Sequence, residues 1–114
     1  MGADPSTHER GDAVLDSGLT YDGIARVTVH VTQRGNRYRF SDGGGAVEAA
    51  GVTLRRRALP DRIRLGERSV NVSGWGVVWL PAVESAGEEW LAEVPRLVAE
   101  GSVALYERLL DASD

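Results

Sequence analysis

The chain has 114 residues, 42% of them hydrophobic, and a formal net charge of −4. This length is sufficient for one domain with one core. Cysteine is absent, which excludes disulfides, thiolate metal sites and cysteine nucleophiles, and two histidines leave little for a zinc site. We therefore expect no metal, no cofactor and a reducing, cytoplasmic setting in a bacterial-type protein.

The N-terminal segment and the hydropathy of the chain give no sign of export or membrane insertion. Residues 1–14 lack the apolar segment of a signal peptide, and no apolar run approaches the roughly 18 residues that span a bilayer. Residues 1–18 are polar and without periodicity, so they predict a flexible tail. We expect a single domain over residues 19–114 and no membrane contact.

Charge is segregated along the chain. Residues 1–25 carry one arginine against five acids, residues 26–68 carry ten against four, and residues 69–114 carry two against eight. The middle of the chain is therefore cationic between two acidic ends. A basic patch can form there although the chain as a whole is acidic.

Alternating residues predict a first β-hairpin after Ile24. Two apolar sets alternate with polar residues on either side of "QRGN", namely Val27, Val29 and Val31, then Tyr38 and Phe40. A tight turn at Arg34 and Gly35 would place both sets on one face of the sheet. That register predicts His30 opposite Arg39.

The segment "RYRFSDGGGAVEAAG", residues 37–51, passes from strand alternation through three glycines to small residues with helical spacing. Asp42 is a favoured N-cap for a helix over residues 44–50, with Gly51 at its C-terminal end. A phosphate-binding loop would use the same backbone N–H groups, but Asp42 repels anions and no P-loop or G-x-G-x-x-G spacing is present. We interpret the segment as a structural corner, which explains every residue except the third glycine, Gly45.

The following residues predict a second hairpin after an ambiguous segment. Residues 60–66 fit either a short helix between Pro60 and Gly66 or a strand with alternating Ile63 and Leu65, and we favour the helix. Alternation over residues 70–73 and in "VVWLPAV", residues 77–83, flanks a "GWG" turn. Pro81 implies an edge or an end in the second of these strands.

A long helix is predicted at the C-terminus. Ser85 and Glu88 have the spacing of a capping box, and apolar residues recur at intervals of three and four up to Leu109. Pro95 should kink this helix. The order of elements predicts an α+β fold of two layers, in which two hairpins form an antiparallel sheet covered by the long kinked helix, with one or two short helices between the hairpins.

The order of these parts resembles a family of small uncharacterised bacterial proteins that are common in actinobacteria. The residues that carry the resemblance are a hairpin ending in Ser/Thr-Asp-x-Gly and a second hairpin with Val-Asn-Val and Gly-Val-Val, here residues 41–43, 70–72 and 76–78. It covers residues 19–112. The resemblance implies the fold and no particular activity.

A catalytic role is the less favoured interpretation. The predicted register puts Ser41 diagonal to His30 on a face that also holds arginines, which invites comparison with a hydrolase. A serine nucleophile also needs a base within hydrogen-bonding reach, a group that orients this base and an oxyanion site. The sequence specifies none of these, so we favour a non-catalytic protein.

We therefore predict a non-catalytic binding or regulatory module that acts through protein–protein contacts, with another protein or as a homo-oligomer. Trp75, between two glycines at a hairpin tip, is the interface candidate, because interfaces favour tryptophan. The alternative is that Trp75 folds back onto its own sheet.

Nucleic-acid association through an arginine-rich surface is the alternative function. The acidic total and the lack of aromatic residues expected between the arginines argue against it. Whether the arginines cluster in space decides the question. The candidate surface residues are Arg26, His30, Arg37, Arg39, Arg55, Arg56, Arg57, Arg62 and Arg64.

Overall fold

The computed structural model describes residues 10–51 and 59–112 of the chain. The elements in chain order are β1 (Arg10–Thr20), β2 (Arg26–Arg34), β3 (Arg37–Ser41), α2 (Gly45–Ala50), β4 (Arg62–Leu65), β5 (Arg68–Val72), β6 (Val78–Val83), a 3-10 helix (Glu84–Ala86) and α3 (Glu88–Ala112).

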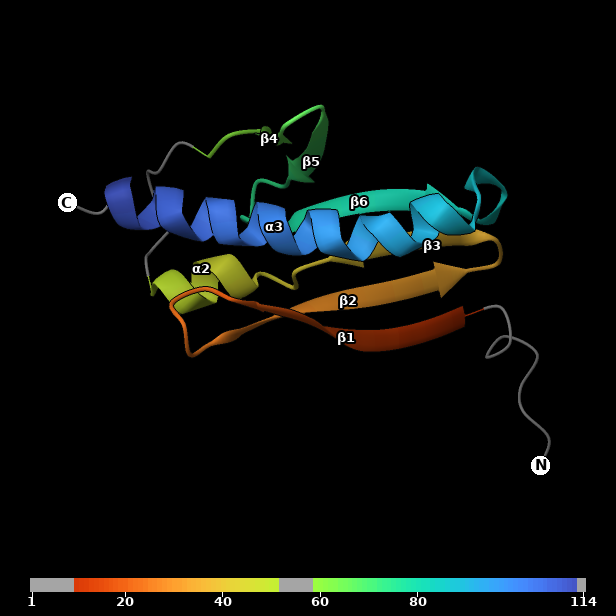
Figure 1. The fold of residues 1–114 in the computed structure, drawn as a ribbon, viewed down its shortest axis with the longest axis horizontal. Helices are drawn as coiled ribbons and strands as arrows, with labels where there is room; N and C mark the ends of the chain where they lie inside the picture. The colour runs from red at the N-terminus through yellow and green to blue at the C-terminus, as the bar shows by residue number, and fades with distance from the viewer. Residues whose placement is uncertain (1–9, 52–58, 113–114) are drawn as a thin grey trace.

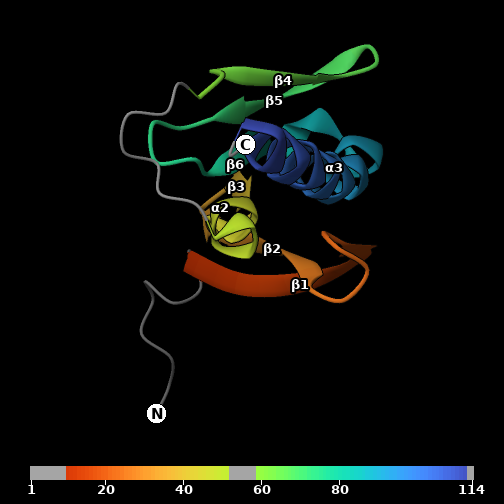
Figure 2. The ribbon, with the colours of Figure 1, turned by 90° about the vertical axis from the view of Figure 1, so that its left-hand side faces the viewer.

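The strands form one antiparallel sheet of six strands in the order β1-β2-β3-β6-β5-β4. Helix α3 runs along one face of this sheet (Figure 1). Seen from the end, the strands curve partly around α3, and α2 lies at one end of the sheet (Figure 2). The predicted α+β fold with an antiparallel sheet and a covering C-terminal helix is confirmed.

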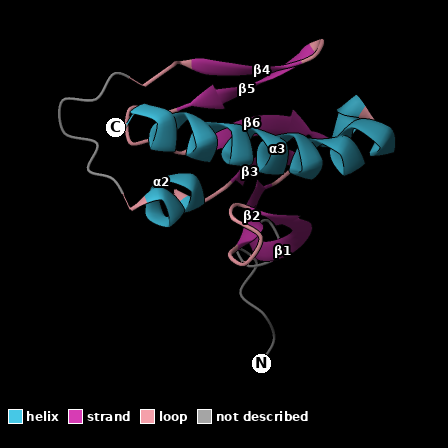
Figure 3. Cartoon of the chain, turned by 60° about the vertical axis from the view of Figure 1, so that its left-hand side comes forward, coloured by secondary structure: helices cyan, strands magenta, loops and turns pink. Residues whose placement is uncertain are grey.

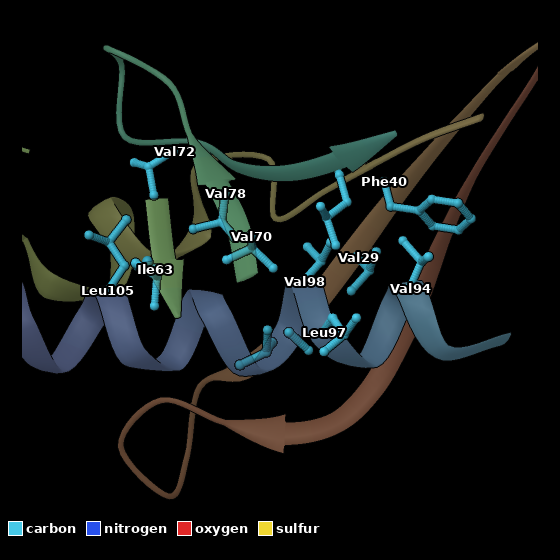
Figure 4. Close-up of a cluster of buried hydrophobic side chains, with 14 of the residues drawn as sticks. Val29, Phe40, Ile63, Val70, Val72, Val78, Val94, Leu97, Val98 and Leu105 are labelled. Carbon is cyan, nitrogen blue, oxygen red and sulfur yellow. The ribbon is translucent and has the colours of Figure 1, made fainter. Parts of the chain in front are cut away.

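The core lies between the sheet and α3, because alternate strand residues point toward the helix. On β2 these are Val27 and Val29, both fully buried, and on β6 they are Val78, Leu80 and Ala82. Buried side chains from the strands and from α3 interdigitate in the close-up (Figure 4). Coloured by secondary structure, the chain shows the same division into a sheet and a long helix (Figure 3).

Helix α3 begins two residues later than the capping box at Ser85 predicts. Residues 84–86 form a separate 3-10 turn, and Gly87 follows with φ 101° and ψ 154°, a conformation that separates this turn from the helix. The first helical bond runs from the N–H of Leu91 to the carbonyl oxygen of Gly87, at 3.1 Å. Pro95 lies inside α3, and the helix continues on both sides of it.

The predicted tail is wrong over residues 10–18, because β1 pairs with β2 along this stretch. Leu15 pairs with Val29 and Asp12 with Thr32. The strand lies at the edge of the sheet and carries charged residues, which is a usual way for an edge to discourage further pairing. Because of this composition, the alternation of apolar and polar residues that marks a strand is not evident in the sequence of β1. Residues 1–9 lie outside the described part of the chain.

The first hairpin has the predicted faces but a different register. Its loop is Gly35 and Asn36, so His30 pairs with Ser41 instead of Arg39. Gly35 has a φ of 63°, which the turn requires and which glycine adopts readily. Moving the turn by one residue shifts the pairing by two residues. Because side chains alternate between the faces with a period of two, this shift leaves every side chain on its predicted face.

Residues 62–65 form a strand, β4, so the helix favoured for residues 60–66 is wrong. Ile63 points into the core and pairs with Val70, while Arg62 and Arg64 are exposed. Two-residue alternation was the better guide here, and Pro60 precedes the strand instead of starting a helix. The predicted second hairpin is present as β5 and β6.

No helix in the described part of the chain is long and apolar enough to cross a membrane.

Candidate functional site

The corner after β3 is organised by the buried carboxylate of Asp42, which is 2% exposed. Its Oδ1 accepts hydrogen bonds from the backbone N–H groups of Gly44, at 2.9 Å, and Val78, at 3.0 Å. Its Oδ2 accepts from the hydroxyl of Ser102, at 2.7 Å, and from the N–H of Ala46, at 3.4 Å. One side chain therefore joins the corner to β6 and α3.

This arrangement corrects the predicted N-cap. The residue at the N-cap of α2 is Gly44, with a φ of 82° and no side-chain cap, and the helix starts at Gly45. Asp42 lies before that position, where it satisfies donors from three separate elements. At the other end, Gly51 closes α2 in the left-handed conformation, as predicted.

Tyr21 extends the same network. Its hydroxyl lies 2.7 Å from the Oγ of Ser102, whose own hydrogen goes to Asp42, so the tyrosine donates. A Cβ added at Gly45 would lie 2.5 Å from the Tyr21 hydroxyl oxygen. The third glycine of the segment is therefore required by the close approach of Tyr21, which supports a structural role for the corner.

Burial raises the pKa of Tyr21 above its ordinary value. The negative charges of Asp42 and Glu48 add to this shift. Because the folded-state pKa is raised, the resulting stability is present below about pH 10 and is lost as the pH rises through the folded-state value.

We expect the free energy of unfolding to fall as the pH rises above about 10, and to fall less in Tyr21→Phe, which has no phenol to ionise at this site. Urea denaturation of both proteins at pH 8 and at pH 11 measures the difference. An equal loss in both proteins would contradict the assignment of this effect to Tyr21.

Ser41 and His30 lie directly opposite each other in the sheet rather than on a diagonal. The Oγ of Ser41 accepts from the N–H of Gly43, at 3.3 Å, and within the described residues no hydrogen bond joins it to His30. The imidazole lies against Gly43, where an added Cβ would be 2.6 Å from Nε2. The described residues contain no group of three potential metal ligands.

The structure gathers most of the predicted basic residues on the sheet face opposite α3, which we call the outer face. They occupy the outward positions of the strands, as the alternation of buried and exposed residues shows. These residues are Arg26 and His30 on β2, Arg37 and Arg39 on β3, and Arg62 and Arg64 on β4. Arg55, Arg56 and Arg57 lie outside the described residues.

Two arginines at the β1 side of the outer face are paired with acids. Arg26 contacts Asp16 at 2.9 Å, and Arg34, which the sequence analysis did not select, lies 3.9 Å from Asp12. These pairs are exposed, so their contribution to stability is small. The two ion pairs balance the positive charge of these arginines at the edge of the outer face formed by β1.

Trp79 lies among the arginines of the outer face, which the sequence analysis did not anticipate. It is half-buried and pairs with Ser41 on one side and Asn71 on the other. The guanidinium carbon of Arg39 lies 4.3 Å from the centroid of its ring. Val78 and Leu80 on either side of it are buried, so Trp79 points outward. Residues 77–80 are all apolar, so no alternation in the sequence indicates this direction.

Trp75 is 84% exposed, so the prediction of an accessible indole is confirmed and the alternative, that it folds back onto the sheet, is wrong. Its loop is held by Ser73, whose Oγ accepts from the N–H groups of Trp75 and Val77, both at 3.2 Å. The carbonyl oxygen of Ser73 accepts from Gly76 at 2.9 Å. The indole therefore projects from an ordered loop.

Ile24 is a second exposed apolar residue that sequence reasoning missed, at 86% exposed. It lies in the turn between β1 and β2, where Oδ1 of Asp22 accepts from the N–H groups of Ala25, at 2.8 Å, and Ile24, at 2.9 Å. These bonds lower the pKa of Asp22 below its ordinary value. The Asp-Gly dipeptide at residues 22–23 was the available signal for an ordered turn.

No family model, no curated protein and no solved structure matches this chain. The family resemblance in the sequence therefore stays a prediction.

Proposed function

We propose that the protein is a non-catalytic binding module and that the loop carrying Trp75 makes its protein contact. The observation that carries this proposal is the exposure of a large indole on a loop fixed by hydrogen bonds. A rigid aromatic side chain loses little conformational entropy on binding and supplies a large contact area. A cytoplasmic location is part of the proposal, since a chain without cysteine has no need of an oxidising compartment.

A second copy of the chain is the partner we propose. A two-fold contact is self-complementary, so the same exposed side chain is used on both subunits. One indole offers up to about 250 Å² of contact area per subunit. That is a small part of the roughly 1,200–2,000 Å² of a stable interface, so we expect association to be weak.

Trp75→Ala should abolish self-association and leave folding stability nearly unchanged, because the side chain makes little contact within its own chain. Sedimentation velocity from low micromolar to millimolar protein should show a growing dimer fraction for the wild type only. Val83→Ser is the matched control, since Val83 is an exposed apolar residue at the opposite end of β6.

A wild type that stays monomeric over the whole concentration range contradicts the proposal. So does a Trp75→Ala variant that dimerises as well as the wild type. A loss of folding stability above roughly 3 kcal/mol would place Trp75 in the core instead, because that is the range for truncating a buried aromatic residue.

A further inference from the structure

The outer face of the sheet presents one continuous row of side chains across all six strands. Successive pairings align Val14, His30, Ser41, Trp79, Asn71 and Arg62. Helix α3 occupies the opposite face, as the end view shows (Figure 2). The row is therefore a ready contact surface with a tryptophan near its middle.

The charge on this face is unbalanced. Within the described residues, Arg37, Arg39, Arg62 and Arg64 form no ion pair, and all four are exposed. The acids on the outward positions of the described strands lie on β1, where they already contact arginines. The centre and the β4 side of the face are thus cationic, which favours a polyanionic ligand.

The opposite side of the molecule is acidic. Exposed carboxylates are spread along α3, namely Glu88, Glu89, Glu107 and Asp111. A chain with a net charge of −4 therefore has a strongly asymmetric surface. A polyanion is repelled from the helix side and attracted to the sheet side, so charge alone selects the outer face.

Trp79 and Arg39 distinguish this face from a simple basic patch. Nucleobases stack on aromatic rings and on guanidinium planes, and the two groups lie 4.3 Å apart here. Ser41, His30 and Asn71 flank the indole along the row and offer hydrogen bonds to base edges. Stacking groups among arginines suit a ligand that carries both charged phosphates and aromatic bases.

A single strand fits this surface better than a duplex. Stacking on Trp79 requires a base whose face is free, and bases in a duplex are already stacked on one another. The grooves of duplex DNA admit a helix or a two-stranded ribbon, whereas this face belongs to a six-stranded sheet. We propose that the outer face binds single-stranded nucleic acid, with a base stacked at Trp79 and Arg39 and phosphates at the neighbouring arginines.

The test is fluorescence anisotropy with a labelled thymidine 15-mer. We expect a dissociation constant of about 1 to 100 µM near physiological salt, the range of sequence-independent binding. Trp79→Ala should weaken binding about five- to 150-fold, as truncation of one stacked aromatic residue does. Trp79→Tyr retains a stacking ring and should stay within about threefold of the wild type.

The salt dependence tests the arginines separately. Single strands give a slope of about −0.7 for each phosphate contact, so changing both Arg62 and Arg64 to Ala should reduce the slope by up to about 1.4. Arg96→Ala is the matched control, because Arg96 is an exposed arginine on α3, at the acidic side. Its slope should equal that of the wild type.

Three outcomes would overturn the proposal. Trp79→Ala could bind the 15-mer as tightly as the folded wild type, a duplex of equal length could bind as tightly as the single strand, or poly-L-glutamate could compete equally per charge. The last result would assign the face to acidic proteins. None of these outcomes bears on Trp75, so failure here leaves the proposed protein contact to its own test.

Discussion

Asp42→Ala should lower the free energy of unfolding by at least about 3 kcal/mol. The variant leaves the N–H groups of Val78 and Ala46 and the hydroxyl of Ser102 without their acceptor, and each stranded buried donor costs about 1 to 3 kcal/mol. Urea denaturation measures the loss. An N-cap alone would account for only about 0.5 to 2 kcal/mol.

Asp22→Ala is the matched control for this prediction. Asp22 also accepts two backbone N–H groups at a glycine-containing turn, but it is exposed, so water replaces the lost carboxylate. We expect a much smaller loss than for Asp42→Ala. Similar losses in the two variants would show that burial and the link to Ser102 contribute nothing, and that the corner is held by local bonds only.

Gly101→Ala should destabilise the protein by about 1 to 3 kcal/mol, the usual penalty for overpacking a core. Alanine normally stabilises the middle of a helix relative to glycine by about 1 kcal/mol. Here the added Cβ would collide with the side chain of Val70 and lie 3.1 Å from Cγ1 of Val78. Both valines are fully buried in strands, so α3 has to move away from the sheet.

A double-mutant cycle separates this collision from other effects of the substitution. In a Val70→Ala background the Cβ at position 101 has room, and the second substitution should become neutral or stabilising. Urea denaturation of the two single variants and the double variant gives the coupling. If Gly101→Ala alone stabilises the otherwise wild-type protein, the close packing of α3 on β5 is contradicted.

The sequence predicted those elements whose pattern is strong and local. Val27 and Val29 alternate clearly with polar residues, and the heptad-like spacing that ends at Leu109 defines α3. Strand β1 was missed because an edge strand with acids on its outer side has few apolar residues. The pairing of His30 was wrong by two residues because alternation fixes the face of a side chain and leaves such shifts open.

The candidate surfaces were predictable to different degrees. Exposure of Trp75 followed from the glycines on either side of it, which provide no covering side chain. The contact between Asp42 and Ser102 joins residues 60 positions apart, and no local pattern encodes such a contact. The clustering of the arginines depends on strand order, since β3 and β4 lie apart in the chain and share one face only through β6 and β5.

The indole N–H resonances of the three tryptophans give the most direct test of the proposed protein contact. Each reports on a different surface. Trp75 reports on the exposed loop and Trp79 on the outer face, and Trp90 reports on the start of α3, where it contacts Arg68 of β5. In 15N-labelled protein concentrated from micromolar to millimolar, the Trp75 resonance should shift and broaden while that of Trp90 stays in place. A Trp75 resonance that does not move, or one that moves only together with that of Trp90, would contradict a contact made by this loop.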